Sequence, residues 1–229
     1  PSRERVEANR KTLAEFPPGG FRGEKEYAAV MAGVKADAPA YKRMNEGAQA
    51  LAKKDYDLAI RKANEALQIQ PDEAMFHALA AAAFHAKGQD RNALTMINKA
   101  VSLNGDYYEY YLLRGKIKKA LGDPTAAADL KRSSQLLPTA TASNLLGHLA
   151  LDAGDREAAA RYFGDAAESK GEAGRAAQAA QARLILADNP GRFFGFDARM
   201  DRQGRAEIQL KNTCGIPLRR ISIQVSSRR

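Results

Sequence analysis

The chain has 229 residues, of which 45% are hydrophobic and 28% charged, and it contains no tryptophan. No apolar run approaches the roughly 18 residues that a membrane-spanning helix requires, so the composition favours close-packed helices over a transmembrane protein. The single cysteine, Cys214, excludes an internal disulfide and makes a thiolate zinc site implausible, since such a site needs several ligands.

The net charge of +9 is concentrated near the end of the sequence. Residues 1–39 have 7 basic and 6 acidic side chains, residues 40–171 have 18 and 16, and residues 172–229 have 11 and 5. Interspersed signs in the middle are typical of a solvated helical array, whereas an RNA-binding array concentrates Lys and Arg along one face. A nucleic-acid hypothesis therefore depends on the tail.

Two helices are predicted within residues 1–39. The first covers residues 2–15 and is stopped by the Pro-Pro-Gly-Gly run at 17–20. The second covers residues 24–36 and is expected to end before Pro39, because proline lacks a backbone donor and clashes with the preceding turn. Both helices are interpreted as an N-terminal cap.

Residues 40–171 contain four segments of similar pattern. Each has a turn, and the four turns are Lys54-Asp55, Gly88-Gln89, Gly122-Asp123 and Gly154-Asp155. The spacings between them are 34, 34 and 32 residues, which is the length of a helix–turn–helix repeat.

Small side chains recur at matching offsets in these segments, where paired helices must approach closely. Before the turns lie Gly47, Ala81, Gly115 and Gly147. Five residues after the turns lie Ala59, Ala93, Ala127 and Ala159. Seven residues further lie Ala66, Ala100, Ser134 and Ala166.

This pattern resembles the tetratricopeptide repeat family over residues 40–171, as in Gly47…Ala59…Ala66…Pro71 and Gly147…Ala159…Phe163…Ala166. It departs from the family pattern at Arg43, Glu46 and Lys131 and in the shorter spacing before the fourth repeat. The resemblance implies a mainly α fold, a tetratricopeptide α-solenoid of about four helix pairs with capping helices. Stacked repeats bury one another's apolar faces, so the array needs such caps.

Residues 172–190 are predicted to form the C-terminal capping helix, and the period then changes from about 3.6 to 2. Alternation in residues 194–200, 206–210 and 221–225 predicts a small antiparallel β segment within residues 191–229. Three strands are marginally stable unless something covers their apolar face. The cover would be the capping helix, a second copy of the chain, or strands beyond residue 229, and we favour the last.

No catalytic residue, metal ligand or cofactor site is predicted in this chain. His77, His85 and His148 are each followed by Ala or Leu, so none begins the H-E-x-x-H zinc motif. The acidic residues show no pairing typical of acid–base catalysis, and Cys214 has no positioned histidine that would activate it.

In the tetratricopeptide family, the first helix of each repeat lines a concave groove that binds a peptide or protein. Carried over position by position, the resemblance predicts a groove formed by Tyr41, Met44, Met75, Ala78, His85, Glu109, Leu112, Lys116, Lys119, Asn144 and His148. Tyr108 is added as a contact anchor, because tyrosine suits half-wet interfaces. One end of this groove is apolar and the other is polar to basic, so it suits a peptide with a hydrophobic part and an acidic part. For Leu112, a place in the core between repeats is equally plausible. The carboxylate clamp of some relatives needs Lys and Asn at set groove positions, and these are not present.

The first residues, Pro1-Ser2-Arg3-Glu4-Arg5-Val6, resemble the segment that closes the catalytic domain of bacterial zinc metalloproteases of the CAAX-prenyl-protease type, which include a β-barrel assembly-enhancing protease. The resemblance implies that the chain is the non-catalytic, C-terminal partner-binding region of a metalloendopeptidase in envelope protein quality control. Zinc would then be bound only in an upstream domain, and the location would be the periplasm or cell envelope.

Two other hypotheses come from the tail. Its excess of 11 basic over 5 acidic residues suggests a nucleic-acid-binding helical array. Its predicted strands, if their edges are open, suggest a structural module that forms homo-oligomers.

Overall fold

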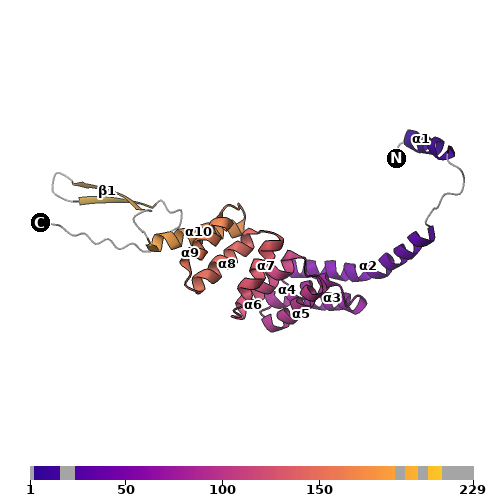
Figure 1. Ribbon diagram of the computed structural model, residues 1–229, viewed down its shortest axis with the longest axis horizontal. Helices are drawn as coiled ribbons and strands as arrows, with labels where there is room; N and C mark the ends of the chain where they lie inside the picture. Colours follow the sequence, from indigo (N-terminus) through magenta and orange to yellow (C-terminus); the bar gives the residue numbers. More distant parts are fainter. Residues whose placement is uncertain (1–2, 16–23, 189–193, 201–205, 213–229) are drawn as a thin grey trace.

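The computed structural model describes residues 3–15, 24–188, 194–200 and 206–212. Within these ranges lie ten helices and two strands, and the helices α2–α10 stack side by side into an elongated array (Figure 1). The helices are α1 (Arg3–Ala14), α2 (Glu24–Ala52), α3 (Tyr56–Ile69), α4 (Ala74–Ala86), α5 (Asp90–Leu103), α6 (Tyr108–Ala120), α7 (Ala126–Leu136), α8 (Ala140–Asp152), α9 (Arg156–Ala167) and α10 (Glu172–Asp188). The fold is a mainly helical solenoid, as the sequence predicts.

Each repeat is a pair of antiparallel helices joined by a tight turn: α2–α3, α4–α5, α6–α7 and α8–α9. The four predicted turns are all present, and each contains one residue in the left-handed region. These residues are Lys54 (φ 63°), Gly88 (φ 79°), Gly122 (φ 70°) and Gly154 (φ 80°). Glycine adopts this conformation without strain, which explains its use in three of the four turns.

The small positions allow the paired helices to touch. A Cβ atom added to Gly115 would lie 2.7 Å from the Leu130 side chain, and one added to Gly147 would lie 2.6 Å from the Phe163 ring. Leu130 and Phe163 are both fully buried. In the third and fourth pairs a large side chain on the second helix therefore fills the space that glycine leaves on the first.

The third repeat differs from its predicted register by one residue. Ala126 and Ser133 are buried there, whereas the predicted Ala127 and Ser134 are only half-buried. In the other repeats the buried alanine donates to the carbonyl four residues earlier, but the Ala126 amide donates to the Asp123 carbonyl three residues earlier. The tighter first turn of α7, which follows Pro124, advances the buried face by one residue.

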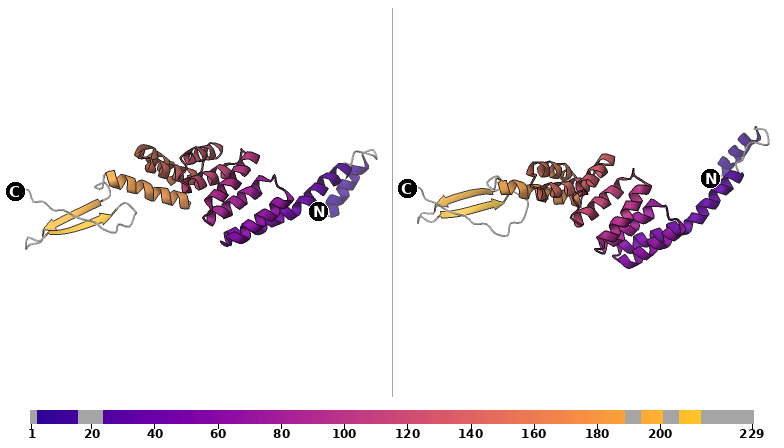
Figure 2. Two further views of the ribbon diagram at one scale, coloured as in Figure 1. Left: turned by 90° about the horizontal axis from the view of Figure 1, so that it is seen from below. Right: turned by 60° about the horizontal axis from the view of Figure 1, so that its bottom comes forward.

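Helix α2 is continuous through Pro39, so the predicted helix end before this residue is wrong. Pro39 and Lys35 are both exposed, which lets water solvate the Lys35 carbonyl that loses its amide partner. The first half of α2 extends past the other repeat helices (Figure 2). It has three exposed large side chains, those of Tyr27, Val30 and Val34.

Strands β1 (Phe194–Met200) and β2 (Ala206–Asn212) form a two-stranded antiparallel sheet. Their register pairs Phe194 with Asn212 and Met200 with Ala206. The predicted strand at residues 221–225 and Cys214 lie outside the described residues.

A buried carboxylate fixes the third helix pair. Asp129 of α7 is 6% exposed and accepts two hydrogen bonds from Arg114 of α6, at 2.9 and 2.6 Å. The Lys118 Nζ atom lies 2.7 Å from the same carboxylate, and Arg114 also donates to Asn98 of α5. Because a buried charge is tolerated only when it is paired, this network holds α6 and α7 in one register.

The glycine contacts predict that Gly147→Ala destabilises the chain. The added methyl group must displace the Phe163 ring, and overpacking costs about 1–3 kcal/mol, which exceeds the ~1 kcal/mol that alanine gains over glycine within a helix. Gly164→Ala is the control, because its Cβ would meet only the Gln181 Nε2 atom, at 3.6 Å. Urea unfolding should show a lower free energy of unfolding for Gly147→Ala and a slightly higher one for Gly164→Ala. Equal increases in the two variants would contradict the inference that the helices approach closely at Gly147.

Asp129→Asn is expected to lower the free energy of unfolding by about 3–5 kcal/mol, because it leaves two half-buried cations without their carboxylate. Glu157→Gln is the control, since the Glu157–Arg161 pair is 86% and 66% exposed and should contribute less than about 0.5 kcal/mol. Denaturant midpoints of the two variants would test the difference. Similar midpoints would show that the buried network does not fix the pair.

Candidate binding groove

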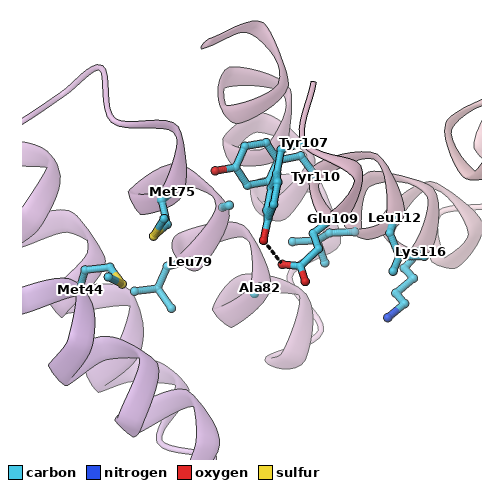
Figure 3. A pocket seen from close by; sticks show the side chains of 11 residues that line it. Met44, Met75, Leu79, Ala82, Tyr107, Glu109, Tyr110, Leu112 and Lys116 are labelled. Atoms are coloured by element: carbon cyan, nitrogen blue, oxygen red, sulfur yellow. Dashed lines mark hydrogen bonds between the residues drawn. The ribbon is translucent and has the colours of Figure 1, made fainter. Parts of the chain in front are cut away.

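The first helices of the first three repeats, α2, α4 and α6, together line a pocket of about 450 Å³ (Figure 3). Its lining residues are Met44, Met75, Ala78, Leu79, Ala82, Tyr107, Glu109, Tyr110, Leu112, Leu113 and Lys116. Most of these side chains are apolar, and the charged groups are confined to Glu109 and Lys116.

The apolar part of the pocket comes from adjacent repeats. Met44 of α2 packs against the core cluster of Ala40, Ala66 and Phe76, and Leu79 of α4 lies between Met44 and Met75 (Figure 3). Met75 is 45% exposed. Alanines at 78 and 82 keep the middle of the groove open, because a larger side chain there would fill the pocket.

Tyrosines and a carboxylate form one rim of the pocket. Tyr107 donates to Glu109 Oε2 and Tyr108 donates to Glu109 Oε1, both at 3.0 Å. These hydrogen bonds to Glu109 raise the pKa of both phenols. The Tyr107 and Tyr110 rings meet edge to face with centroids 4.9 Å apart, a favourable arrangement of aromatic rings.

A second carboxylate repeats this arrangement at the start of α4. Glu73 caps the helix by accepting from the Met75 amide at 3.2 Å, and its other oxygen accepts from the Tyr41 hydroxyl at 3.0 Å. Burial raises the pKa of Tyr110 to about 12, and the charges of Glu73 and Glu109 contribute to the shift. Within the described parts of the chain, neither carboxylate forms an ion pair. We call Tyr41, Glu73, Tyr107, Glu109 and Tyr110 the tyrosine–glutamate rim; Tyr107, Glu109 and Tyr110 line the pocket, and Tyr41 and Glu73 lie outside its lining.

Helix α6 ends in a basic segment whose lysines differ in their partners. Lys118 contacts the buried Asp129 at 2.7 Å, and Lys119 lies 3.7 Å from Asp152. Lys116 lines the pocket and, among the residues that the structure describes, has no acidic partner. The groove therefore has an acidic side at the starts of α4 and α6 and an uncompensated cation further along α6.

Comparison with known proteins identifies the fold. The small glutamine-rich tetratricopeptide repeat-containing protein 2 of Saccharomyces cerevisiae is 35% identical over 84 residues, which are 37% of this chain and 24% of the relative. The fold is that of a tetratricopeptide repeat protein. The chain spans only about a quarter of that relative's length, and no protein-family model matches it.

Solved structures share this fold. The structure of pilF from Pseudomonas aeruginosa has a TM-score of 0.62 at 20% identity and covers 68% of this chain and 72% of its own. The first tetratricopeptide domain of Spaghetti (RPAP3), bound to the HSP90 peptide SRMEEVD, has a TM-score of 0.50 at 24% identity and covers 52% of this chain and 95% of its own.

The structure brings half of the predicted groove residues together. Six of the twelve line the pocket: Met44, Met75, Ala78, Glu109, Leu112 and Lys116. Tyr41 and Tyr108 lie beside it and donate to Glu73 and Glu109. The pocket is thus formed by the first three tetratricopeptide repeats.

The other four predicted residues lie away from the pocket. His85 is 2.5 Å from Asp90 in its own repeat, and Lys119 faces Asp152. The His148 ring packs edge to face on Phe163 at 5.1 Å, and Asn144 has a buried side-chain oxygen without a described partner.

The sequence prediction omitted Leu79, Leu113, Tyr110 and Glu73. Leu79 and Leu113 each follow a predicted groove position directly. They would have been included if more residues on the first helix of each repeat had been assigned to the groove. Glu73 carries a recognisable signal, because an acidic residue directly before an apolar run is typical of a helix start.

The described part of the chain also lacks a metal-binding cluster and a membrane-spanning helix. It contains no group of three or more His, Cys, Asp or Glu side chains that could hold a metal ion. None of its helices is long and apolar enough to cross a membrane.

The raised pKa of Tyr110 predicts a pH dependence at high pH. Between its ordinary value of 10.0 and about 12, the unfolded chain releases a proton that the folded chain keeps. The free energy of unfolding should therefore fall as the pH rises through this range. Tyr110→Phe removes this phenol, so the step near pH 12 in a near-ultraviolet absorbance titration should disappear. Its persistence in the variant would contradict the assignment.

Proposed function

We propose that this chain is a protein-binding tetratricopeptide scaffold that holds a peptide segment of a partner in the groove of its first three repeats. The observation that carries the proposal is the mostly apolar pocket of about 450 Å³, which lies across α2, α4 and α6 and whose charged lining residues are Glu109 and Lys116. Mostly apolar concave sites with a few placed polar groups are typical of ligand binding. The Spaghetti domain, solved with the HSP90 peptide SRMEEVD, supports a peptide as the ligand class.

The arrangement of the repeats suits a peptide better than a small molecule. Three helices contribute to one open surface, and Met75 is 45% exposed on it. An extended chain can bury side chains along such a surface, and flexible methionines adapt to them.

A pair of variants with matched exposure tests the proposal. Met75→Glu places a charge on the apolar surface, while Leu137→Glu places one outside the groove, and both parent side chains are 45% exposed. Peptides selected from a random display library on the wild-type chain should bind Met75→Glu about tenfold or more weakly, because an apolar contact worth about 1.5–3 kcal/mol is lost. Leu137→Glu should bind like the wild type.

Fluorescence anisotropy with the selected peptides would measure these affinities. Selection of no peptide above the background of an unrelated protein would refute the proposal. Equal losses in both variants would place the binding surface elsewhere.

The wider context remains a proposal based on the resemblance of residues 1–6 to a metalloprotease segment. In that proposal the chain is the partner-binding region of an envelope zinc endopeptidase, in the periplasm or at the cell envelope, and zinc belongs to an upstream catalytic domain. The gene sequence upstream of Pro1 tests it, since an H-E-x-x-H motif is expected there.

A further inference from the structure

We infer that the groove binds a peptide that presents a cationic side chain, a large apolar side chain and a carboxylate, in that order along α6. The cation is held at the tyrosine–glutamate rim, the apolar side chain enters the pocket, and the carboxylate pairs with Lys116. This inference rests on the proposed function and adds the chemistry of the ligand.

The rim provides the cation site. Both Glu109 oxygens accept hydrogen bonds, but their donors are the neutral hydroxyls of Tyr107 and Tyr108 at 3.0 Å, so the negative charge is oriented without being neutralised. Glu73 is held in the same way by Tyr41. Carboxylates beside tyrosine rings attract a guanidinium or ammonium group through charge-assisted hydrogen bonds and cation–π contact.

The apolar side chain has its place in the middle of the groove. Met44, Met75 and Leu79 lie on one side of the pocket, and Leu112 lies on the side toward Lys116 (Figure 3). Glu109 lies between these two sides in the same view. Leu112 and Leu113 line the pocket and lie between Glu109 and Lys116 in the sequence of α6, so an apolar ligand side chain that packs on them lies between the two charged groups.

Lys116 provides the anion site because its neighbours are already paired. Arg114 and Lys118 share Asp129, and Lys119 faces Asp152. In the described part of α6, Lys116 is the basic residue that lines the pocket without an acidic partner. A ligand carboxylate would supply one.

The spacing of the two charges defines the ligand. Glu109 and Lys116 are seven residues apart on one face of α6, which is two turns or about 10 Å along the helix. A peptide in the polyproline II conformation rises about 3.1 Å per residue with three residues per turn, so its side chains at i and i+3 lie on one face, about 9 Å apart. The ligand's cation and carboxylate are therefore expected at positions i and i+3, with the apolar side chain between them.

This arrangement disfavours strongly acidic peptides. A run of carboxylates such as that in SRMEEVD, the peptide bound to the Spaghetti domain, would meet Glu73 and Glu109 at the rim. Lys116 alone faces the pocket to balance them. We expect this peptide to bind more weakly than one with the mixed-charge pattern.

Synthetic peptides with an Arg-Leu-Ser-Glu core in Gly-Ser flanks, blocked at both ends, test the inference by fluorescence anisotropy. Replacing Arg by citrulline, or Glu by Gln, should weaken binding to the wild-type chain about tenfold. Replacing the peptide's Arg by citrulline should not change its affinity for the Glu109→Gln variant of the protein. Replacing the peptide's Glu by Gln should not change its affinity for the Lys116→Gln variant. A peptide ending at Ser with a free carboxylate distinguishes a C-terminal carboxylate from a side-chain one.

Glu157→Gln is the matched control, since it removes an exposed acidic charge far from the groove, and it should keep the full citrulline effect. If library-selected apolar peptides bind the groove but the charged replacements change nothing, the inference is wrong while the proposed function stands. The same holds if SRMEEVD binds most tightly, or if Glu157→Gln and Glu109→Gln have equal effects. If no peptide of either set binds, the proposed function itself fails.

Discussion

The close approach of paired helices at positions without a side chain determines the rest of this structure. Gly115 and Gly147 leave room that Leu130 and Phe163 fill, and both large residues are fully buried. Because a close-packed core leaves no room to shift these large side chains, each of the two pairs is held in a single register. The outer faces of α2, α4 and α6 are therefore presented side by side in fixed orientation, and the groove is a consequence of packing on their opposite faces.

The charges are organised by the same packing. The helix pair α6–α7 buries Asp129 together with Arg114 and Lys118, which uses the cations that point toward the core. Tyrosine hydroxyls rather than cations hold Glu73 and Glu109 at the groove. Among the described residues of the groove, the charges without an ion-pair partner are consequently those that a ligand can reach. A solenoid that is nearly neutral along its length can still have a strongly polarised binding surface.

Much of the fold was predictable because the repeat imposes it several times. Four turns with a left-handed residue and small residues facing each other recur at a spacing that the sequence shows directly. The errors fall where one local interaction departs from the repeat. The i−3 hydrogen bond at Ala126 shifts the buried face of α7, and the exposed position of Pro39 lets α2 continue. The rim was not predictable, since periodicity shows which face of a helix a residue lies on but not which hydroxyl its carboxylate accepts from.

The two parts of the groove contribute differently to recognition. Its apolar side is rich in methionine, leucine and alanine, and flexible methionine side chains adapt to many apolar partners, which gives affinity with little discrimination. In the rim, Glu109 accepts a hydrogen bond at each oxygen and the Tyr107 and Tyr110 rings contact each other, so the carboxylate is oriented. A fixed charge penalises a ligand that cannot match it, since the ligand must then desolvate the carboxylate without replacing its water. Selectivity in this groove therefore arises at its edges, from a small number of charges whose positions depend on glycine contacts in the core behind them.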